Sequence, residues 1–395
     1  MVEKLLQKYC PDGVEFKDLG DVLDYEQPWK YLVDSTNYDN SYKTPVLTAW
    51  QTFILWYTDE EDWIYQASKE NPVIIFDDFT TAFKWVDFQF KAKSSAMKML
   101  TSKNVEEYNL RYVFFAMSCL TYSPQDHARQ WIQTYSKIQI PIPPIKIQKE
   151  IVKILDTFTE LEAELEAELE AELEARKKQY EYYRDDLLSF GDDEVEWKEL
   201  GEVWEMIRGN WLQKTDFLEN WFPCIHYWQL YTFYWTFANN TKSFCSFELA
   251  KKLKIAKYWD VLIAWTSENI EDVNKATGWL GNYEIAISGD MFAFRPNSEL
   301  NWKFLTYIFQ TKRYFDYKRK YARWTKVTRV PSKNIEQFKI PVISLEKQQE
   351  IVAILDKFDA LVNDISIWLP AELKARRQQY EYYRNKLLTF KVLEK

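Results

Sequence analysis

Residues 138–190, which include the string QYEYYR at positions 179–184, return as residues 338–390, with QYEYYR unchanged at 379–384. The two copies are offset by two hundred residues and align without a gap. Each copy opens on an Ile-Pro pair, Ile140-Pro141 and Ile340-Pro341. The segments between the copies barely resemble each other. The chain therefore keeps one scaffold twice and varies what each scaffold carries.

A weaker repeat marks where each variable segment begins. VEFKDLGDV at residues 14–22 corresponds to VEWKELGEV at residues 195–203. The chain thus divides into four parts with pseudo-two-fold character. These are a first variable domain (1–137), a first helical spacer (138–190), a second variable domain (191–337) and a second helical spacer (338–395).

The shared segments have the periodicity of long helices. In the second copy, apolar residues recur every three or four positions, at Ile351, Ile354, Leu355, Phe358, Leu361, Val362 and Ile365. The first copy repeats the pattern after Pro143 and Pro144, and prolines are typical of a helix start. Pro370 interrupts the second pattern, so we expect a kink or a short break there.

The variable segments have the pattern of a mixed α/β fold. Runs of β-branched and aromatic residues predict strands at 72–76, 260–264 and 291–295. A helix-like spacing of aromatic residues predicts a helix near 303–317. The sequence therefore favours an α+β architecture with two mixed α/β domains separated by two long helices.

A four-residue repeat, Leu-Glu-Ala-Glu, fills residues 161–174. All its residues are good helix formers. Each extra unit would lengthen a helix by about 6 Å, which is close to two base-pair steps of DNA at roughly 3.4 Å each. A solvated acidic helix without a special role would have the same composition. Because the repeat lies in the connector between the two variable domains, we also consider it a ruler.

The acidic repeat dominates the charge of the chain. The net charge is −9, yet residues 160–174 contain eight glutamates and no cation, which leaves only −1 for the rest. Local basic patches for an anionic partner are thus compatible with the composition. The four cysteines are scattered and the chain has only two histidines, which predicts free thiols and no metal site. Without an apolar signal core or a long apolar run, we expect a cytoplasmic protein with no membrane partner.

Tryptophan is abundant where glycine is scarce. The chain has 18 Trp and 8 Gly, whereas average usage would give roughly 28 Gly. Several tryptophans, including Trp50, Trp56, Trp259 and Trp324, lie in turn-like contexts in which a positive φ would favour glycine. We hypothesise that some of these residues are glycine codons read under another genetic code, or substitutions.

The doubled motif resembles the specificity subunit of type I restriction–modification systems. The resemblance rests on IPIPPIKIQKEIV at residues 140–152 and ARKKQYEYYR at 175–184, together with their second copies. It implies two target-recognition domains, each for one half of a split DNA sequence. It also implies a long antiparallel two-helix coiled coil that spaces these domains.

The same resemblance implies the partners. They are double-stranded DNA, two methyltransferase (modification) subunits docked on the helices, and restriction subunits. The family's specificity subunit is not catalytic and holds no cofactor of its own. S-adenosylmethionine, ATP and Mg are expected on the partner subunits.

Basic residues interleaved with aromatic ones are the candidate DNA contacts. The strongest stretch is 312–329, because its cations could neutralise phosphates and its arginines could read guanine. The first half offers a weaker set, for which surface solubility is an equally good explanation. The candidates are Lys312, Arg313, Lys318, Arg319, Lys320, Arg323, Lys326 and Arg329 in the second half, and Lys84, Lys91, Lys93 and Arg129 in the first.

Catalytic motifs of the relevant enzymes are missing from the sequence. We find no Asn/Asp-Pro-Pro-aromatic motif of amino-methyltransferases and no glycine-rich phosphate loop. A DNA-specificity subunit is therefore preferred over two alternatives: a self-contained methyltransferase or nuclease, and a coiled-coil adaptor that does not contact DNA.

Overall fold

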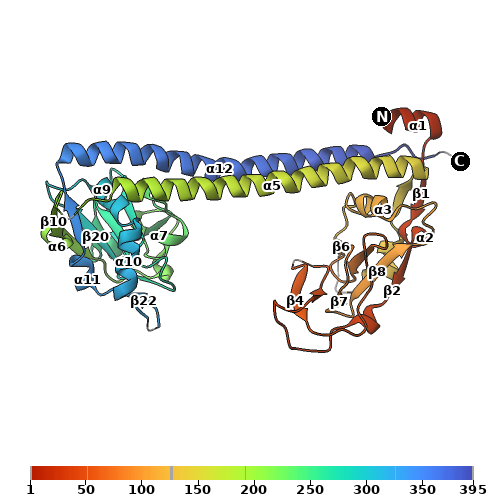
Figure 1. Cartoon of the computed structure of the whole chain (residues 1–395), viewed down its shortest axis with the longest axis horizontal. Helices are drawn as coiled ribbons and strands as arrows, with labels where there is room; N and C mark the ends of the chain where they lie inside the picture. Colours follow the sequence, from red (N-terminus) through yellow and green to blue (C-terminus); the bar gives the residue numbers. More distant parts are fainter. Residues whose placement is uncertain (1, 51, 125–127, 192, 325, 394–395) are drawn as a thin grey trace. The chain divides into compact units, whose positions relative to one another are not determined.

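The computed structural model describes residues 2–50, 52–124, 128–191, 193–324 and 326–393. It divides into two compact units (Figure 1). One unit is Met1–Ala167 with Ala371–Lys395, and the other is Glu168–Pro370. Each unit therefore contains one variable domain and a part of both long helices.

The first half of the chain leads into the first long helix. Its elements are α1 (Val2–Tyr9), β1 (Glu15–Asp18), α2 (Leu19–Val22), β2 (Leu23–Glu26), η1 (Pro28–Tyr31), β3 (Thr44–Leu47), β4 (Ile54–Thr58), β5 (Val73–Asp77), β6 (Phe83–Val86), β7 (Lys91–Ala92), β8 (Met97–Ser102), α3 (Leu110–Met117), α4 (Gln130–Gln133), η2 (Tyr135–Lys137), β9 (Gln139–Ile142) and α5 (Ile145–Leu187).

The second half follows the same plan with more strands. Its elements are β10 (Glu196–Glu199), α6 (Leu200–Val203), β11 (Trp204–Arg208), η3 (Lys214–Asp216), β12 (Phe222–Ile225), α7 (Gln229–Thr232), β13 (Phe237–Ala238), β14 (Ser243–Cys245), α8 (Phe247–Ala250), β15 (Lys254–Ala256), β16 (Val261–Ala264), β17 (Thr266–Ser267), β18 (Ala276–Trp279), β19 (Ile285–Ile287), β20 (Met291–Pro296), α9 (Trp302–Ile308), α10 (Lys312–Tyr321), β21 (Arg323–Trp324), β22 (Thr328–Arg329), α11 (Ser332–Glu336), β23 (Lys339–Val342) and α12 (Leu345–Leu388).

The main sheets of the two domains have the same strand order despite their different sequences. The first domain has β2-β8-β5-β6, and the second has β11-β20-β16-β18 with β13 added at the edge. The central strands β5 and β16 are apolar and buried along their length, as strands with neighbours on both sides should be. The strands predicted at 72–76, 260–264 and 291–295 are thereby confirmed as β5, β16 and β20.

The weaker repeat and the Ile-Pro repeat turn out to be strand partners. In the first half β1 pairs antiparallel with β9, and Phe16 lies opposite Pro141. In the second half β10 pairs with β23 in the same register, and Trp197 lies opposite Pro341. Proline is tolerated because each ladder has only two strands, so one side of each strand needs no ladder partner. The repeated segments therefore form a two-stranded ladder that closes each domain where its long helix begins.

A buried glutamine joins the start of each long helix to the N-terminal end of a short helix of the same domain, α3 or α9. The Gln148 side-chain oxygen accepts a hydrogen bond from the Asn109 backbone N–H (2.8 Å), and its amide nitrogen donates to the Glu107 and Pro143 carbonyls (2.8 and 2.7 Å). Asn109 is the N-cap residue of α3. The amide therefore fixes the angle at which α5 leaves the domain.

Gln348 repeats this arrangement in the second half. Its oxygen accepts from the backbone of Asn301, the N-cap residue of α9 (2.7 Å), and its nitrogen donates to the Glu299 and Ile343 carbonyls (2.9 and 2.8 Å). Both glutamines are fully buried. Equal bonding at equivalent positions supports a duplicated structural unit.

Each domain's core includes the first turns of its long helix. In the first unit, Ile147, Ile151 and Leu155 of α5 pack with the sheet residues Ile74 and Phe76. In the second unit, α12 contributes Ile351, Val352 and Leu355 to the core around α9 and β16. The helices thus begin as parts of the domains rather than as free extensions.

Within each unit, α5 and α12 touch through equivalent aromatic pairs. Phe158 stacks on Tyr383 in the first unit (ring centroids 6.3 Å apart), and Tyr183 stacks on Phe358 in the second (5.5 Å). These four residues exchange when the two copies of the repeat are exchanged. In the first unit Arg377 also donates to Glu162 and Glu166 (3.2 and 2.9 Å). In each unit the two helix segments run antiparallel.

The C-terminal residues return to Val14, directly before the first strand β1. The Val14 N–H donates to the Lys391 carbonyl (2.8 Å), and the Leu393 N–H donates to the Val14 carbonyl (3.0 Å). Gly13 makes the approach possible, because its φ is +125° and a Cβ there would lie 2.8 Å from the backbone of Val392. The C-terminal segment is thereby part of the first unit.

Two predictions about helices are corrected. The predicted helix over 303–317 is two helices, α9 and α10, because the chain turns at Phe309–Thr311, where Thr311 caps the second helix. The short break considered at Pro370 is absent, since α12 stays helical through that residue. The kink, which a proline causes by removing one backbone donor and crowding the preceding turn, stays a prediction.

We predict that Gln148→Met and Gln348→Met each lower the free energy of unfolding by roughly 2–3 kcal/mol, because one N–H and two carbonyls lose their partners in a buried site. Urea unfolding of the full chain measures the effect. Gln349→Met is the matched control, since Gln349 is exposed one position further along α12. Equal stability of Gln348→Met and Gln349→Met would contradict the role given to the buried amide.

Candidate nucleic-acid interface

The first part of the predicted basic stretch forms helix α10, which has one buried face and one exposed face. The Thr311 hydroxyl accepts from the Tyr314 N–H and starts the helix (3.2 Å). Tyr314 and Lys318, four residues apart, form the buried face. The Tyr314 ring packs between Phe309 and Phe338, with centroids 4.5 and 4.9 Å away. The remaining cations of α10 consequently face solvent.

Lys318, a predicted DNA contact, is instead a structural residue. Only 5% of it is exposed. Its ammonium group donates to the Glu271 and Val273 carbonyls (2.9 and 2.7 Å). Burial lowers the pKa of Lys318 to about 8. A phosphate could not reach this ammonium group, so the sequence-based assignment is wrong for this residue.

Lys312 and Arg313 are exposed but engaged at the start of α10. Lys312 pairs with Asp316 one turn later (2.7 Å). Arg313 donates to the Lys339 carbonyl of β23 (2.7 Å) and lies over the Trp197 ring at 4.2 Å. Both ladder strands β10 and β23 are thereby tied to α10. Arg313 is better explained as a clamp on the domain's closing ladder than as a base-reading residue.

The other five predicted cations of this half are exposed. Arg319 and Lys320 end α10, and the hairpin β21–β22 follows it directly. This exposed set is Arg319, Lys320, Arg323, Lys326 and Arg329. It forms a continuous piece of chain, interrupted only at residue 325, which lies outside the described residues.

A pair of arginines on one indole extends this set, and the sequence analysis missed half of it. Arg329 of β22 and Arg208 of β11 both lie over the Trp265 ring, at 5.1 and 4.3 Å from its centroid. Trp265 is held by its Nε1–H, which donates to the Val330 carbonyl (2.9 Å). Arg208 escaped detection because it is a lone cation in a strand, far from any charge run. Only the topology brings it to Arg329.

Guanidinium groups that lie over an aromatic ring can keep N–H donors available for a ligand. Asp290 engages one edge of Arg329 at 3.5 Å, while Arg208 and Arg329 are both exposed. Stacking on an aromatic face holds the guanidinium plane and leaves planar paired donors for phosphate or guanine. The five exposed cations and Arg208 together are called the hairpin cluster below.

The first domain presents fewer free cations. Lys91 is 3% exposed and is paired with Glu60, so its predicted DNA contact is wrong. Lys84 is half-buried on β6. Lys93 is exposed, donates to the Tyr38 hydroxyl (3.1 Å) and lies 5.2 Å from the Trp56 ring. Arg129 is exposed at the start of α4.

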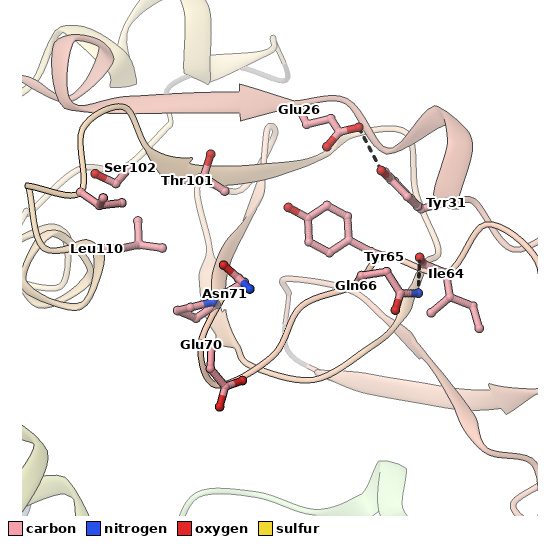
Figure 2. Close-up of a pocket in the computed structure, with 12 residues that line it drawn as sticks. Glu26, Tyr31, Ile64, Tyr65, Gln66, Glu70, Asn71, Thr101, Ser102 and Leu110 are labelled. Atoms are coloured by element: carbon pink, nitrogen blue, oxygen red, sulfur yellow. Dashed lines mark hydrogen bonds between the residues drawn. The ribbon is translucent and has the colours of Figure 1, made fainter.

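A hollow of about 420 Å³ in the first domain has the wrong charge for a nucleic acid (Figure 2). Its lining includes the carboxylates of Glu26 and Glu70 and no lysine or arginine. The Tyr31 hydroxyl donates to Glu26 (3.1 Å), and burial raises the pKa of Tyr65 to about 12. The two carboxylates would repel a phosphate, and the lining has no cation to attract one.

The described residues contain no group of three or more His, Cys, Asp or Glu side chains arranged to hold a metal ion. In the same part of the chain, no helix combines the length and the apolarity that crossing a bilayer requires. The cysteines there are free thiols.

Comparison with known proteins decides the family. The model of the type I restriction modification DNA specificity domain matches residues 11–175 and again 192–375. The chain belongs to the specificity subunits of type I restriction–modification systems. The two matches coincide with the two halves of the repeat, and the subunit is the non-catalytic member of its system.

Named relatives agree over nearly the full length. The chain is 42% identical to the EcoR124I/EcoR124II specificity subunit of Escherichia coli, covering 98% of this chain and 96% of that one. It is 29% identical to a putative type I specificity subunit of Haemophilus influenzae (92% and 96% covered). A solved structure from work on complex assembly and conformational transition of the type I R-M system shares the fold, with a TM-score of 0.67 at 15% identity (96% and 98% covered).

We predict that Lys318 contributes to stability and not to DNA binding. Its pKa is about 8 in the folded chain and 10.5 in a free lysine, so between these values the unfolded chain binds more protons. Unfolding free energy should rise with pH over this window by up to roughly 3 kcal/mol. Lys318→Met should lack that rise when urea unfolding is measured at pH 8 and pH 10.

Lys320→Met is the control for this lysine. Lys320 is exposed two positions away, so its loss should leave the pH dependence of unfolding unchanged. A pH dependence of Lys318→Met equal to that of the parent would contradict the assignment.

Proposed function

We propose that this subunit selects a bipartite site on double-stranded DNA, with each variable domain contacting one half-site. Two domains of equal topology and unlike sequence support the proposal, because a shared frame with different surfaces suits two different sequences. In the second domain the contacts proposed are those of the hairpin cluster. In the first they are Lys93, Arg129 and, to a smaller extent, Lys84.

The observation that carries the proposal is the pair of arginines on Trp265. Phosphate contacts position a protein on DNA, whereas base contacts specify the sequence. Arg319 and Lys320 at the end of α10 suit the first role. Arg208 and Arg329, which both lie over the Trp265 indole, suit the second.

We also propose that α5 and α12 pack as an antiparallel coiled coil that sets the spacer between the half-sites. The contacts between the two helices within each unit support this. The equivalent pairs Phe158–Tyr383 and Tyr183–Phe358 both stack, with interplanar angles of 13° and 14°. The Leu-Glu-Ala-Glu repeat lies between these contacts along α5. A longer repeat would therefore lengthen the connector without altering either domain.

Two equivalent exposed apolar patches suit two copies of one partner. In the first unit the patch is Phe158, Leu161, Tyr382 and Tyr383, and in the second it is Leu361, Tyr182 and Tyr183 with the half-buried Phe358. Tyr382 and Tyr182 are 62% and 67% exposed. Exposed aromatic groups of this kind are enriched at protein interfaces. We propose that each patch docks one modification subunit, which brings S-adenosylmethionine, and that restriction subunits with ATP and Mg complete the complex.

Insertion of one further Leu-Glu-Ala-Glu unit after Glu174 should lengthen the DNA spacer by about one or two base pairs, since the helix grows by about 6 Å. Both half-sites should stay the same. Methylation sequencing of cells that carry the insertion, together with the modification subunit, reads spacer and half-sites at once. An insertion of one Leu-Glu-Ala-Glu unit that leaves the spacer unchanged would reject the ruler.

Loss of one aromatic patch should remove one docked modification subunit. Light scattering after size exclusion should give two copies for the parent, one for Tyr182→Glu and none for Tyr182→Glu/Tyr382→Glu, because a buried carboxylate opposes docking. Glu164→Gln, on the exposed acidic repeat, is the control and should keep both copies. Two copies on the double variant would exclude these patches as the docking sites.

A further inference from the structure

Tryptophan is over-represented at the backbone positions of the described residues that favour glycine. Among the described residues, five other than glycine have a positive φ, and three of the five are tryptophans: Trp63 (54°), Trp221 (127°) and Trp259 (75°). Tryptophan accounts for 18 of 395 residues, so three of five is far above its share. A bulky residue in this region is a steric outlier, because its Cβ approaches the backbone carbonyl.

Trp259 gives the clearest case, because its turn can be identified. The Asp260 N–H donates to the Lys257 carbonyl (3.0 Å), which closes a four-residue turn with Trp259 in the third position. A type II turn has a φ near +80° at that position and requires glycine there. The tryptophan φ of 75° matches this value. Of the four turn tryptophans singled out from the sequence, Trp259 alone has a positive φ; Trp50, Trp56 and Trp324 do not.

Trp221 and Trp63 extend the pattern. The φ of Trp221, directly before β12, lies beyond the small left-handed region that other residues visit. The side chains of the three tryptophans project into solvent, with exposed fractions of 69% (Trp63), 61% (Trp221) and 54% (Trp259). Trp221 has Phe247 as a ring neighbour at 6.0 Å and Trp259 has Tyr258 at 4.9 Å. Tryptophan is normally one of the more buried residue types, and these ring contacts leave all three indoles mostly in solvent, so core packing does not account for them.

The other positive-φ residues show what a tolerated case looks like. Asn274 (58°) is of a type that enters the left-handed region readily. Thr81 (59°) is β-branched and therefore also a steric outlier, but unlike the tryptophans it is buried, and its N–H donates to the Asp77 carbonyl (2.9 Å) in a tight turn. The buried tryptophans provide the opposite contrast. Trp279 is fully buried, and its Nε1–H donates to the Tyr283 carbonyl (3.0 Å).

We infer that residues 63, 221 and 259 are glycines in the protein as its native host makes it. Their codons would then be triplets that one genetic code assigns to tryptophan and the host's code assigns to glycine. Trp279 and Trp131, which fill core space, would be encoded by a different triplet and remain tryptophan. The exposed indoles at the three positions would accordingly not be a stacking surface for DNA or a docking surface for a partner.

Peptide mass spectrometry of the subunit purified from its native host tests the inference directly. Peptides across residues 63, 221 and 259 should have glycine masses, and the peptide across Trp279 should have a tryptophan mass. Tryptophan at all three positions would overturn the inference. Glycine at position 279 would also overturn it, because burial of the indole would then not distinguish genuine tryptophans from positions that the host translates as glycine. The proposed DNA-binding role is unaffected by either result.

Thermal unfolding of the recombinant chain tests the physical argument separately. Trp63→Gly, Trp221→Gly and Trp259→Gly should each raise the Tm by roughly 2–4 °C, the usual shift for one relieved strain in a domain of this size. Trp259→Ala should give no such rise, because alanine keeps the Cβ. Trp211→Gly should also give none, since Trp211 is 78% exposed without a positive φ and glycine there only adds freedom to the unfolded chain. A Tm that falls for all three glycine variants would overturn the inference.

Discussion

A single buried amide in each half holds a long helix to a mixed α/β domain. Gln148 and Gln348 each satisfy one N–H and two carbonyls in places that water does not reach. An unpaired polar group in a buried site lowers the free energy of unfolding by more than a typical hydrogen bond adds to it. The exit direction of each helix is therefore fixed by the geometry of a planar amide. The direction in which each long helix leaves its own domain therefore depends on this junction.

The rest of each domain varies around that junction. The closing ladders β1–β9 and β10–β23 keep the same register, and the main sheets keep the same strand order. The surfaces differ, with Arg208 and Arg329 on Trp265 in the second domain and Lys93 beside Tyr38 and Trp56 in the first. A fixed frame with two unlike surfaces is what the proposed selection of two different half-sites requires.

The sequence predicted the frame better than it predicted the site. The two long helices follow from the repeated segments and their apolar periodicity, and the central strands β5 and β16 follow from continuous apolar runs. Lys318 and Lys91 were wrongly predicted to contact DNA. A run of charges does not show which face of a helix is buried, as for Lys318, or which lysine pairs with a carboxylate, as Lys91 does with Glu60. Arg208 was missed because its partner lies more than a hundred residues away. Contacts between distant strands depend on topology, which local patterns do not contain.

The C-terminal residues that pair with Val14 have a consequence for synthesis. The unit Glu168–Pro370 is one continuous stretch, whereas the other unit needs both the beginning and the end of the polypeptide. Leu388 lies in the core of that first unit. On the ribosome the later half can therefore finish folding while the earlier half still lacks its last helix. The N-terminal domain usually folds first during synthesis, but here its completion has to wait for the last residues of the chain.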